Sequence, residues 1–283
     1  MKLKITTAIP AMALMLCAAG TLSAQEMGPP KVLVINREYT KPGKGGELHE
    51  KSESAFVAAA KANKAPFHYL GMTSMTGPDR ALFFSGYDSF TAWADENKEM
   101  DKIPALGPAL DHAMVGDGDL LSETDTSVWT RDDEKSMNPG NLIGMRYMEL
   151  TLFHIKPGHD AEWDEVVKMV KDAYKKGVPE ANWVMFQEAY GSPGGGYLVI
   201  EPLKSIGEID AHIASGPKFA AAIGRGWHEE AGFADGFLRG RRAIEPVPLR
   251  PEDEPSVARA DCGRAGLLGP EACSCSGKEA GGC

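Results

Sequence analysis

One strand-to-helix turn occurs twice in this chain of 283 residues, 115 positions apart. Lys-Pro-Gly stands at 41–43 and again at 156–158, and in both places one glutamate follows four residues after the glycine and another three residues later. In such a turn proline fixes φ, and glycine supplies a backbone conformation that other residues avoid. The same shift aligns Glu47 with Glu162, Glu50 with Glu165, and Pro78 with Pro193. The repeat therefore predicts a duplicated folding unit.

Each copy predicts the same order of elements. Apolar runs of strand type alternate with Gly/Pro turns, and a helical pattern follows each Lys-Pro-Gly turn, with the repeated glutamates in its first turn, where they complement the helix dipole. The predicted strands are 32–35, 67–73, 82–84 and 127–130, then 147–152, 183–190, 197–200 and 236–239, and the second helices are 89–100 and 205–214. The order β-α-β-β-α-β, twice, predicts an α+β fold of two tandem ferredoxin-like units.

The division of the chain follows from this repeat. A ferredoxin-like unit covers one face of its sheet with helices, so two units in one chain can cover each other's open face, sheet against sheet. We predict a first unit at 25–130, a polar linker at 131–145 that contains Asn138-Pro139-Gly140, and a second unit at 146–245. The two units are expected to form an intrachain pseudo-dimer, and a further homo-oligomer is left open.

The first 24 residues have the order of a secretory signal peptide. Lys2 and Lys4 precede an apolar run at 8–19, and small residues follow up to Ala24. An uncleaved membrane anchor is the alternative, but Pro10 interrupts the run, which is shorter than the roughly 20 residues that a span requires. We therefore expect cleavage near Ala24 and export to the periplasm or the medium, with no membrane span in the mature chain.

Charge and the C-terminal composition exclude some partners. Removing 1–24 takes away two lysines and no acid, so the net charge changes from −10 to −12, which disfavours nucleic acid and anionic lipid. Residues 246–283 are rich in Pro, Gly and Glu and predict a disordered tail. The four remaining cysteines lie in this tail (Cys262, Cys273, Cys275 and Cys283), and disulfides, free thiols and a soft-metal site all remain open.

The second helix of the second unit carries a family resemblance. SIGEIDAHIASGPKF at 205–219 resembles the helix of antibiotic-biosynthesis-monooxygenase-type domains, which belong to the dimeric α+β barrel group together with NIPSNAP-like and EthD-like domains. The resemblance implies an intrachain dimeric α+β barrel. Haem-degrading members of the group use a second histidine as the iron ligand, and Gly216-Pro217 stands in that place here. No haem or other cofactor is therefore expected.

Candidate site residues are polar or aromatic side chains in the predicted strands, together with the histidine of the family motif. Along the strand at 147–152, we expect Met148, Leu150 and Leu152 to face the helices and the alternate residues to face away, as Asn36 and Glu38 do on the duplicate strand. A plain structural role also fits each of them. The candidates for catalysis are His212, Trp183 and Asn36, and those for ligand binding are His68, Glu149, Gln187 and His154.

Two hypotheses of function follow. The first is an exported, non-catalytic protein that binds a small hydrophobic or aromatic ligand in the barrel. The alternative is a cofactor-independent monooxygenase, in which the pocket supplies a base and hydrogen-bond donors to such a substrate. Phosphate-binding loops and nucleophile elbows are absent, and the stretch 227–230 (WHEE) lacks the i, i+4 pair of histidines of zinc proteases. No metal site is expected within the two folded units.

Overall fold

The computed structural model describes residues 28–140, 145–191, 194–224 and 238–241. The first unit contains β1 (Val32–Thr40), α1 (Glu47–Ala62), β2 (Leu70–Thr73), β3 (Arg80–Tyr87), α2 (Phe90–Asp101), α3 (Leu106–Gly118) and β4 (Leu121–Met137). The second contains β5 (Tyr147–Ile155), α4 (Asp160–Gly177), β6 (Trp183–Tyr190), β7 (Gly196–Leu203), α5 (Glu208–Ile223) and β8 (Leu238–Arg241). The predicted signal peptide and tail lie outside the described residues.

The strands form one antiparallel sheet in the order β2-β3-β1-β4-β6-β7-β5-β8. Each half of this order is that of a ferredoxin-like unit, with its first strand between the third and the fourth. β4 of the first unit pairs with β6 of the second and joins the two halves of this curled sheet. We call the half β2-β3-β1-β4 the first sheet and the half β6-β7-β5-β8 the second sheet. The predicted α+β fold of two ferredoxin-like units, packed as a dimeric α+β barrel within one chain, is confirmed.

The predicted linker is shorter than expected. Residues 131–137 continue β4, which is 17 residues long and pairs with β6 as far as Met137 opposite Trp183. This extension follows from the architecture, because the strand that joins two sheets has to pair on both sides. The chain leaves the strand at Asn138, whose φ of 43° lies in the left-handed region.

The repeated turns have the predicted geometry. Gly43 and Gly158 have φ values of 76° and 87°, which a residue with a side chain rarely adopts. The glutamates that follow fall near the start of the helices, with Glu47 and Glu50 in the first turn of α1 and Glu162 in the first turn of α4. These positions agree with the predicted role of complementing the helix dipole.

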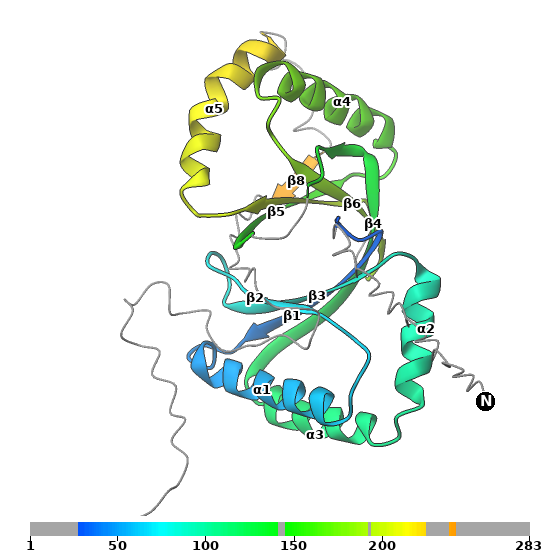
Figure 1. The fold of residues 1–283 in the computed structure, drawn as a ribbon. Helices are drawn as coiled ribbons and strands as arrows, with labels where there is room; N and C mark the ends of the chain where they lie inside the picture. The colour runs from blue at the N-terminus through cyan, green and yellow to red at the C-terminus, as the bar shows by residue number, and fades with distance from the viewer. Residues whose placement is uncertain (1–27, 141–144, 192–193, 225–237, 242–283) are drawn as a thin grey trace, which may run out of the picture.

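The main core lies between the two sheets, which face each other with the helices on the outside (Figure 1). Trp129 and Phe186, one from each unit, are each only 1% exposed. The cluster contains Leu33, Ile35, Met72, Leu82, Phe84, Trp129, Met148, Leu150, Val184, Phe186, Leu198 and Ile200. Since both units contribute to this one cluster, neither unit would keep its sheet face buried alone.

The faces assigned to the strand at 147–152 were wrong. Met148 and Leu150 belong to the core between the sheets, with Leu152 packed against it, whereas Phe153 packs under the helices with Trp163 of α4. Alternation along the strand was predicted correctly, but alternation alone cannot tell which side meets a helix when both sides are covered. Glu149 and, on β1, Asn36 therefore lie on the helix-facing side.

α3 was not predicted. It contains three glycines and a proline in 13 residues, so no helical pattern stands out in its sequence. It packs alongside α1 on the outer side of the first sheet (Figure 1). Among the described residues, every helix is too short or too polar to cross a membrane.

Candidate metal centre

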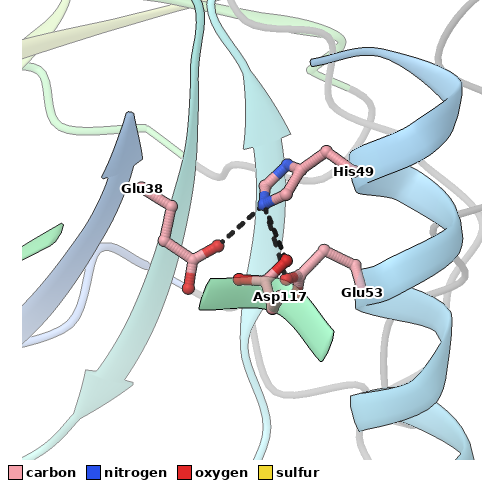
Figure 2. A group of neighbouring side chains, drawn as sticks. All are labelled: Glu38, His49, Glu53 and Asp117. Atoms are coloured by element: carbon pink, nitrogen blue, oxygen red, sulfur yellow. Dashed lines mark hydrogen bonds and ion pairs between the residues drawn. The ribbon is translucent and has the colours of Figure 1, made fainter. Parts of the chain in front are cut away.

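Four ionisable side chains meet between the first sheet and its helices (Figure 2). Glu38 comes from β1, His49 and Glu53 from α1, and Asp117 from α3. Nε2 of His49 lies 3.0 Å from a carboxylate oxygen of Glu38, 3.4 Å from one of Asp117 and 3.7 Å from one of Glu53. We call these four residues the acid–histidine cluster.

Local structure places each member of the cluster. Glu38 lies on the same face of β1 as Val32 and Val34, which pack toward the helices, because positions two and four apart on a strand share a face. His49 and Glu53 are four residues apart on α1, so both point from one side of that helix. Asp117 lies in the last turn of α3, where the chain turns into β4.

The cluster is buried although it carries three carboxylates. The side chains of His49, Glu53 and Asp117 are 5%, 10% and 0% exposed. One oxygen of Glu53 and both oxygens of Asp117 accept no hydrogen bond of normal geometry. Burial of an ionised carboxylate costs several kcal/mol unless hydrogen bonds or opposite charges compensate. One imidazole cannot compensate three carboxylates.

The excess of negative charge changes the proton affinity of the cluster. Burial, together with the charges of Glu38 and Asp117, raises the pKa of Glu53 to about 9. Burial and the charge of Glu38 also raise the pKa of Asp117, and the hydroxyl of Ser52 and the charge of His49 offset this rise only in part. For His49, burial opposes protonation, but the hydrogen bond to Glu38 and the negative charge of Asp117 outweigh it, so the pKa of this histidine is raised as well. All three pKa values are raised, which means that added positive charge stabilises the cluster.

A divalent metal ion would meet that need, and the geometry fits one. One ligand atom from each residue lies within 4.8 Å of the others. Two ligands that each lie about 2.1 Å from one ion are roughly 3.0 to 4.2 Å apart, and the distances from His49 fall in this range. Carboxylate and imidazole ligands suit ions such as Mn²⁺, Fe²⁺ and Zn²⁺. Four protein ligands leave room for water or a further ligand on a six-coordinate ion.

The second unit shows what the same space holds without this cluster. The shift of 115 residues places Phe153 at the position of Glu38. Asp164 and Lys168, which the same shift places at the positions of His49 and Glu53, are 59% and 79% exposed and lie outside this space. Phe153 contacts Trp163 with ring centres 5.2 Å apart, and Trp163 contacts Tyr197 at 5.1 Å. Aromatic packing under the helices is therefore sufficient for the fold, and the first unit has buried charges in a place where the architecture does not require them.

Two of the predicted site residues come together elsewhere. Glu149 of β5 and His212 of α5 lie with Glu201 of β7 in a second group of possible ligand atoms. Nδ1 of His212 is 3.8 Å from Glu201, and the imidazole is 46% exposed. This group lies near the surface, whereas the acid–histidine cluster is enclosed.

The other predicted site residues are scattered. Trp183 packs under α4 against Tyr174 and donates a hydrogen bond from its indole nitrogen to the carbonyl of Lys135. Asn36 accepts a hydrogen bond from Thr126 at 2.7 Å. His68 and Gln187 are exposed, and His154 is half-buried near the end of β5. Among these residues the structure brings together only Glu149 and His212.

Sequence reasoning missed the acid–histidine cluster for identifiable reasons. Glu38 was placed on the wrong face of its strand, and Asp117 lies in a helix that was not predicted. His49 and Glu53 did carry a signal, because a histidine and a glutamate four residues apart on a helix share one face. That signal points to a site only once a third ligand is known to lie opposite.

No protein-family model matches the chain, and no curated protein sequence is similar to it. Among solved structures, it is similar to a candidate monooxygenase of Fusobacterium nucleatum (12% identity, 77% of this chain, 92% of the other, TM-score 0.48). It is also similar to an anthrone oxidase-like protein (12% identity, 80% of this chain, 96% of the other, TM-score 0.46). A third similar structure is that of a NIPSNAP family protein of Agrobacterium tumefaciens (17% identity, 36% of this chain, 94% of the other, TM-score 0.28). These are kinds of protein that the 205–219 segment led us to expect. All three TM-scores are below 0.5, so these structures are not used to assign the fold. The assignment rests on the strand order and the core of this chain, which are those of a dimeric α+β barrel.

Proposed function

We propose that this chain is an exported metal-binding protein, and that its first unit binds one divalent cation through Glu38, His49, Glu53 and Asp117. The observation that supports this most strongly is Asp117. Its carboxylate is fully buried and accepts no hydrogen bond of normal geometry, yet it points toward a histidine and two glutamates that are themselves buried.

A cation accounts for the cluster better than a shared proton does. Three carboxylates and a neutral imidazole carry a charge of −3, and a divalent ion reduces it to −1 while its bonds replace the missing hydrogen bonds. A proton on Glu53 removes one charge but gives neither oxygen of Asp117 a hydrogen bond of normal geometry, and only the hydroxyl of Ser52 acts on this carboxylate as a neighbouring donor. Because carboxylates are hard ligands and imidazole is borderline, Mn²⁺ and Fe²⁺ fit this set best, with Zn²⁺ next.

The binding centre differs from the one expected at first. The hypothesis of a hydrophobic ligand in the barrel needs free space between the sheets, but twelve buried side chains fill that space. The alternative of a cofactor-independent oxygenase needs a base and donors around one substrate, and His212, Trp183 and Asn36 lie in three different places. We retain the class of binding protein and assign the centre to the helix side of the first sheet.

Calorimetric titration of the chelator-treated full-length protein with Mn²⁺ tests this proposal. Mn²⁺ is chosen because thiolates of the tail prefer softer ions. We expect one ion per chain, and we expect Asp117→Asn and Glu53→Gln to weaken binding by at least about 100-fold, since each removes a charged ligand. Asp119→Asn is the matched control, because this exposed carboxylate lies two residues from Asp117. Equal affinity of all four proteins would refute the site.

A further inference from the structure

A conformational property of α3 follows from the acid–histidine cluster, and it rests on the proposed function. α3 is a weak helix by its own sequence. Gly107, Gly116 and Gly118 lower its helical propensity. Its N-cap residue, Ala105, makes no capping hydrogen bond through its side chain, and its end turns carry no acidic residue at the start and no basic residue at the end to complement the dipole. A helix of 13 residues with these features depends on packing for its stability.

That packing comes from one neighbour. Among the described elements α1 is the only one that α3 contacts extensively, and the two helices lie side by side on the outer face of the sheet (Figure 1). Their seam is incompletely filled, because an open groove of about 380 Å³ runs along it, with Leu48 and Ser52 on the α1 side and His112 and Gly116 on the α3 side.

The two ends of α3 are held differently. At the C-terminal end, the backbone N–H of Lys41 donates to the carbonyl of Leu120 at 2.8 Å, and the ammonium group of Lys41 donates to the carbonyl of Asp119 at 3.0 Å. In the first half of the helix only Leu106 is buried, and Ala113, just past the middle, is the next buried apolar residue. The C-terminal end is therefore a fixed point from which the rest of α3 can loosen.

Docking of α3 on α1 brings Asp117 into contact with other acids. Of the charged side chains on α3, only Asp117 is buried, and Glu38 and Glu53 lie on the other side of the same small space (Figure 2). Without a cation, this docking places carboxylates together with few donors between them. With a cation, the same carboxylates and His49 become ligands of one ion, which then links β1, α1 and α3.

We propose that α3 is a metal-dependent element, which packs firmly on α1 when the cluster holds a divalent cation and loosens from its N-terminal end when the cation is removed. Loosening exposes Leu106, Ala113 and the side of α1 that faces them. The metal-free form thus presents an apolar surface that the metal-bound form buries.

Hydrogen–deuterium exchange of the full-length protein, with and without Mn²⁺, measures this directly. Amides of residues 106–118 should exchange at least tenfold more slowly with Mn²⁺, whereas α4 should change little and serves as the internal control. In Asp117→Asn the buried charge is gone, so α3 should be protected without Mn²⁺ and should gain little when Mn²⁺ is added.

The outcomes separate this inference from the proposed function. If Mn²⁺ binds at the cluster but exchange of 106–118 does not change, α3 is not metal-dependent, and the proposed function stands. If Mn²⁺ does not bind, the proposed function fails. In that case, exchange of 106–118 without Mn²⁺ is compared between the wild-type protein and Asp117→Asn. Greater protection in the variant is expected if the charge of Asp117 loosens α3. Equal protection would overturn that idea.

Discussion

Replacement of Glu53 by glutamine should stabilise the metal-free protein, and the gain should grow with pH. The pKa of this carboxyl is raised from 4.5 to about 9 in the folded chain. Between these values the folded state keeps a proton that the unfolded state loses, so the stability of the wild-type protein falls as pH rises from 4.5 toward 9. Each pH unit costs about 1.4 kcal/mol. Glutamine cannot ionise, so the variant escapes this loss.

The magnitude can be checked in chelator-treated protein. Over the two pH units from 5 to 7, the difference in unfolding free energy between Glu53→Gln and wild type should grow by about 3 kcal/mol in favour of the variant. Urea denaturation at both pH values gives this difference. Glu47→Gln is the control, because it removes a carboxylate that belongs to the same helix but is exposed and lies outside the cluster. A difference that stays constant with pH would refute the reasoning.

The same variant should behave in the opposite way when metal is present. At a concentration of Mn²⁺ about 100 times the dissociation constant, the wild-type protein gains roughly 2.7 kcal/mol from binding. Glu53→Gln lacks a ligand and should gain far less. A variant that is more stable than wild type under chelation and relatively less stabilised by metal would show that the buried charge belongs to a binding site.

Three further predictions concern the rest of the chain. Trp129→Ala should lower stability by about 3 to 5 kcal/mol and should affect both units together, since Trp129 belongs to the core that both units share; thermal unfolding in two separate transitions would contradict this. The mature N-terminus should lie close to Gln25, and N-terminal sequencing of protein from the native host that finds Met1 would contradict export. Truncation after Pro251 should change stability by no more than about 0.5 kcal/mol, measured by thermal unfolding, and loss of soluble expression would show that the tail cysteines support the fold.

Much of the fold could be predicted because it is repeated. The Lys-Pro-Gly turns require glycine at Gly43 and Gly158 for a physical reason, since both φ values are positive. Two copies of one pattern at a constant spacing of 115 residues also corrected each other, so that a faint helix in one copy was supported by a clear one in the other. Local patterns of this kind depend on backbone geometry alone, and they survive divergence of the side chains.

Other parts of the fold could not be predicted from local patterns. Both faces of each sheet are covered, so alternation of apolar residues could not show which face meets the helices, and Met148 was assigned to the wrong one. The continuation of β4 to Met137 depends on pairing with β6, a contact between the two units. α3 lacks a helical pattern of its own, so its helical form depends on packing against α1, which a local pattern does not reveal.

The acid–histidine cluster was the least predictable feature, because its members come from three elements. Glu38 and Asp117 are 79 positions apart in the sequence, and only the fold brings them together. The expectation that the two folded units hold no metal site rested on the absence of the residue spacings that known metal-binding motifs have. His49 and Glu53 on one helix face are a weak signal that becomes meaningful only after the fold has placed a carboxylate on either side of them.

A crystal structure of the protein soaked or grown with Mn²⁺ tests the central claim most directly, because anomalous scattering locates the ion independently of the protein atoms. We predict one strong anomalous peak per chain, about 2.1 to 2.3 Å from ligand atoms of Glu38, His49, Glu53 and Asp117. The same crystals grown from Asp117→Asn should show no peak at that position. A wild-type structure in which these four side chains contact one another with no ion between them, at saturating Mn²⁺, would contradict the proposal.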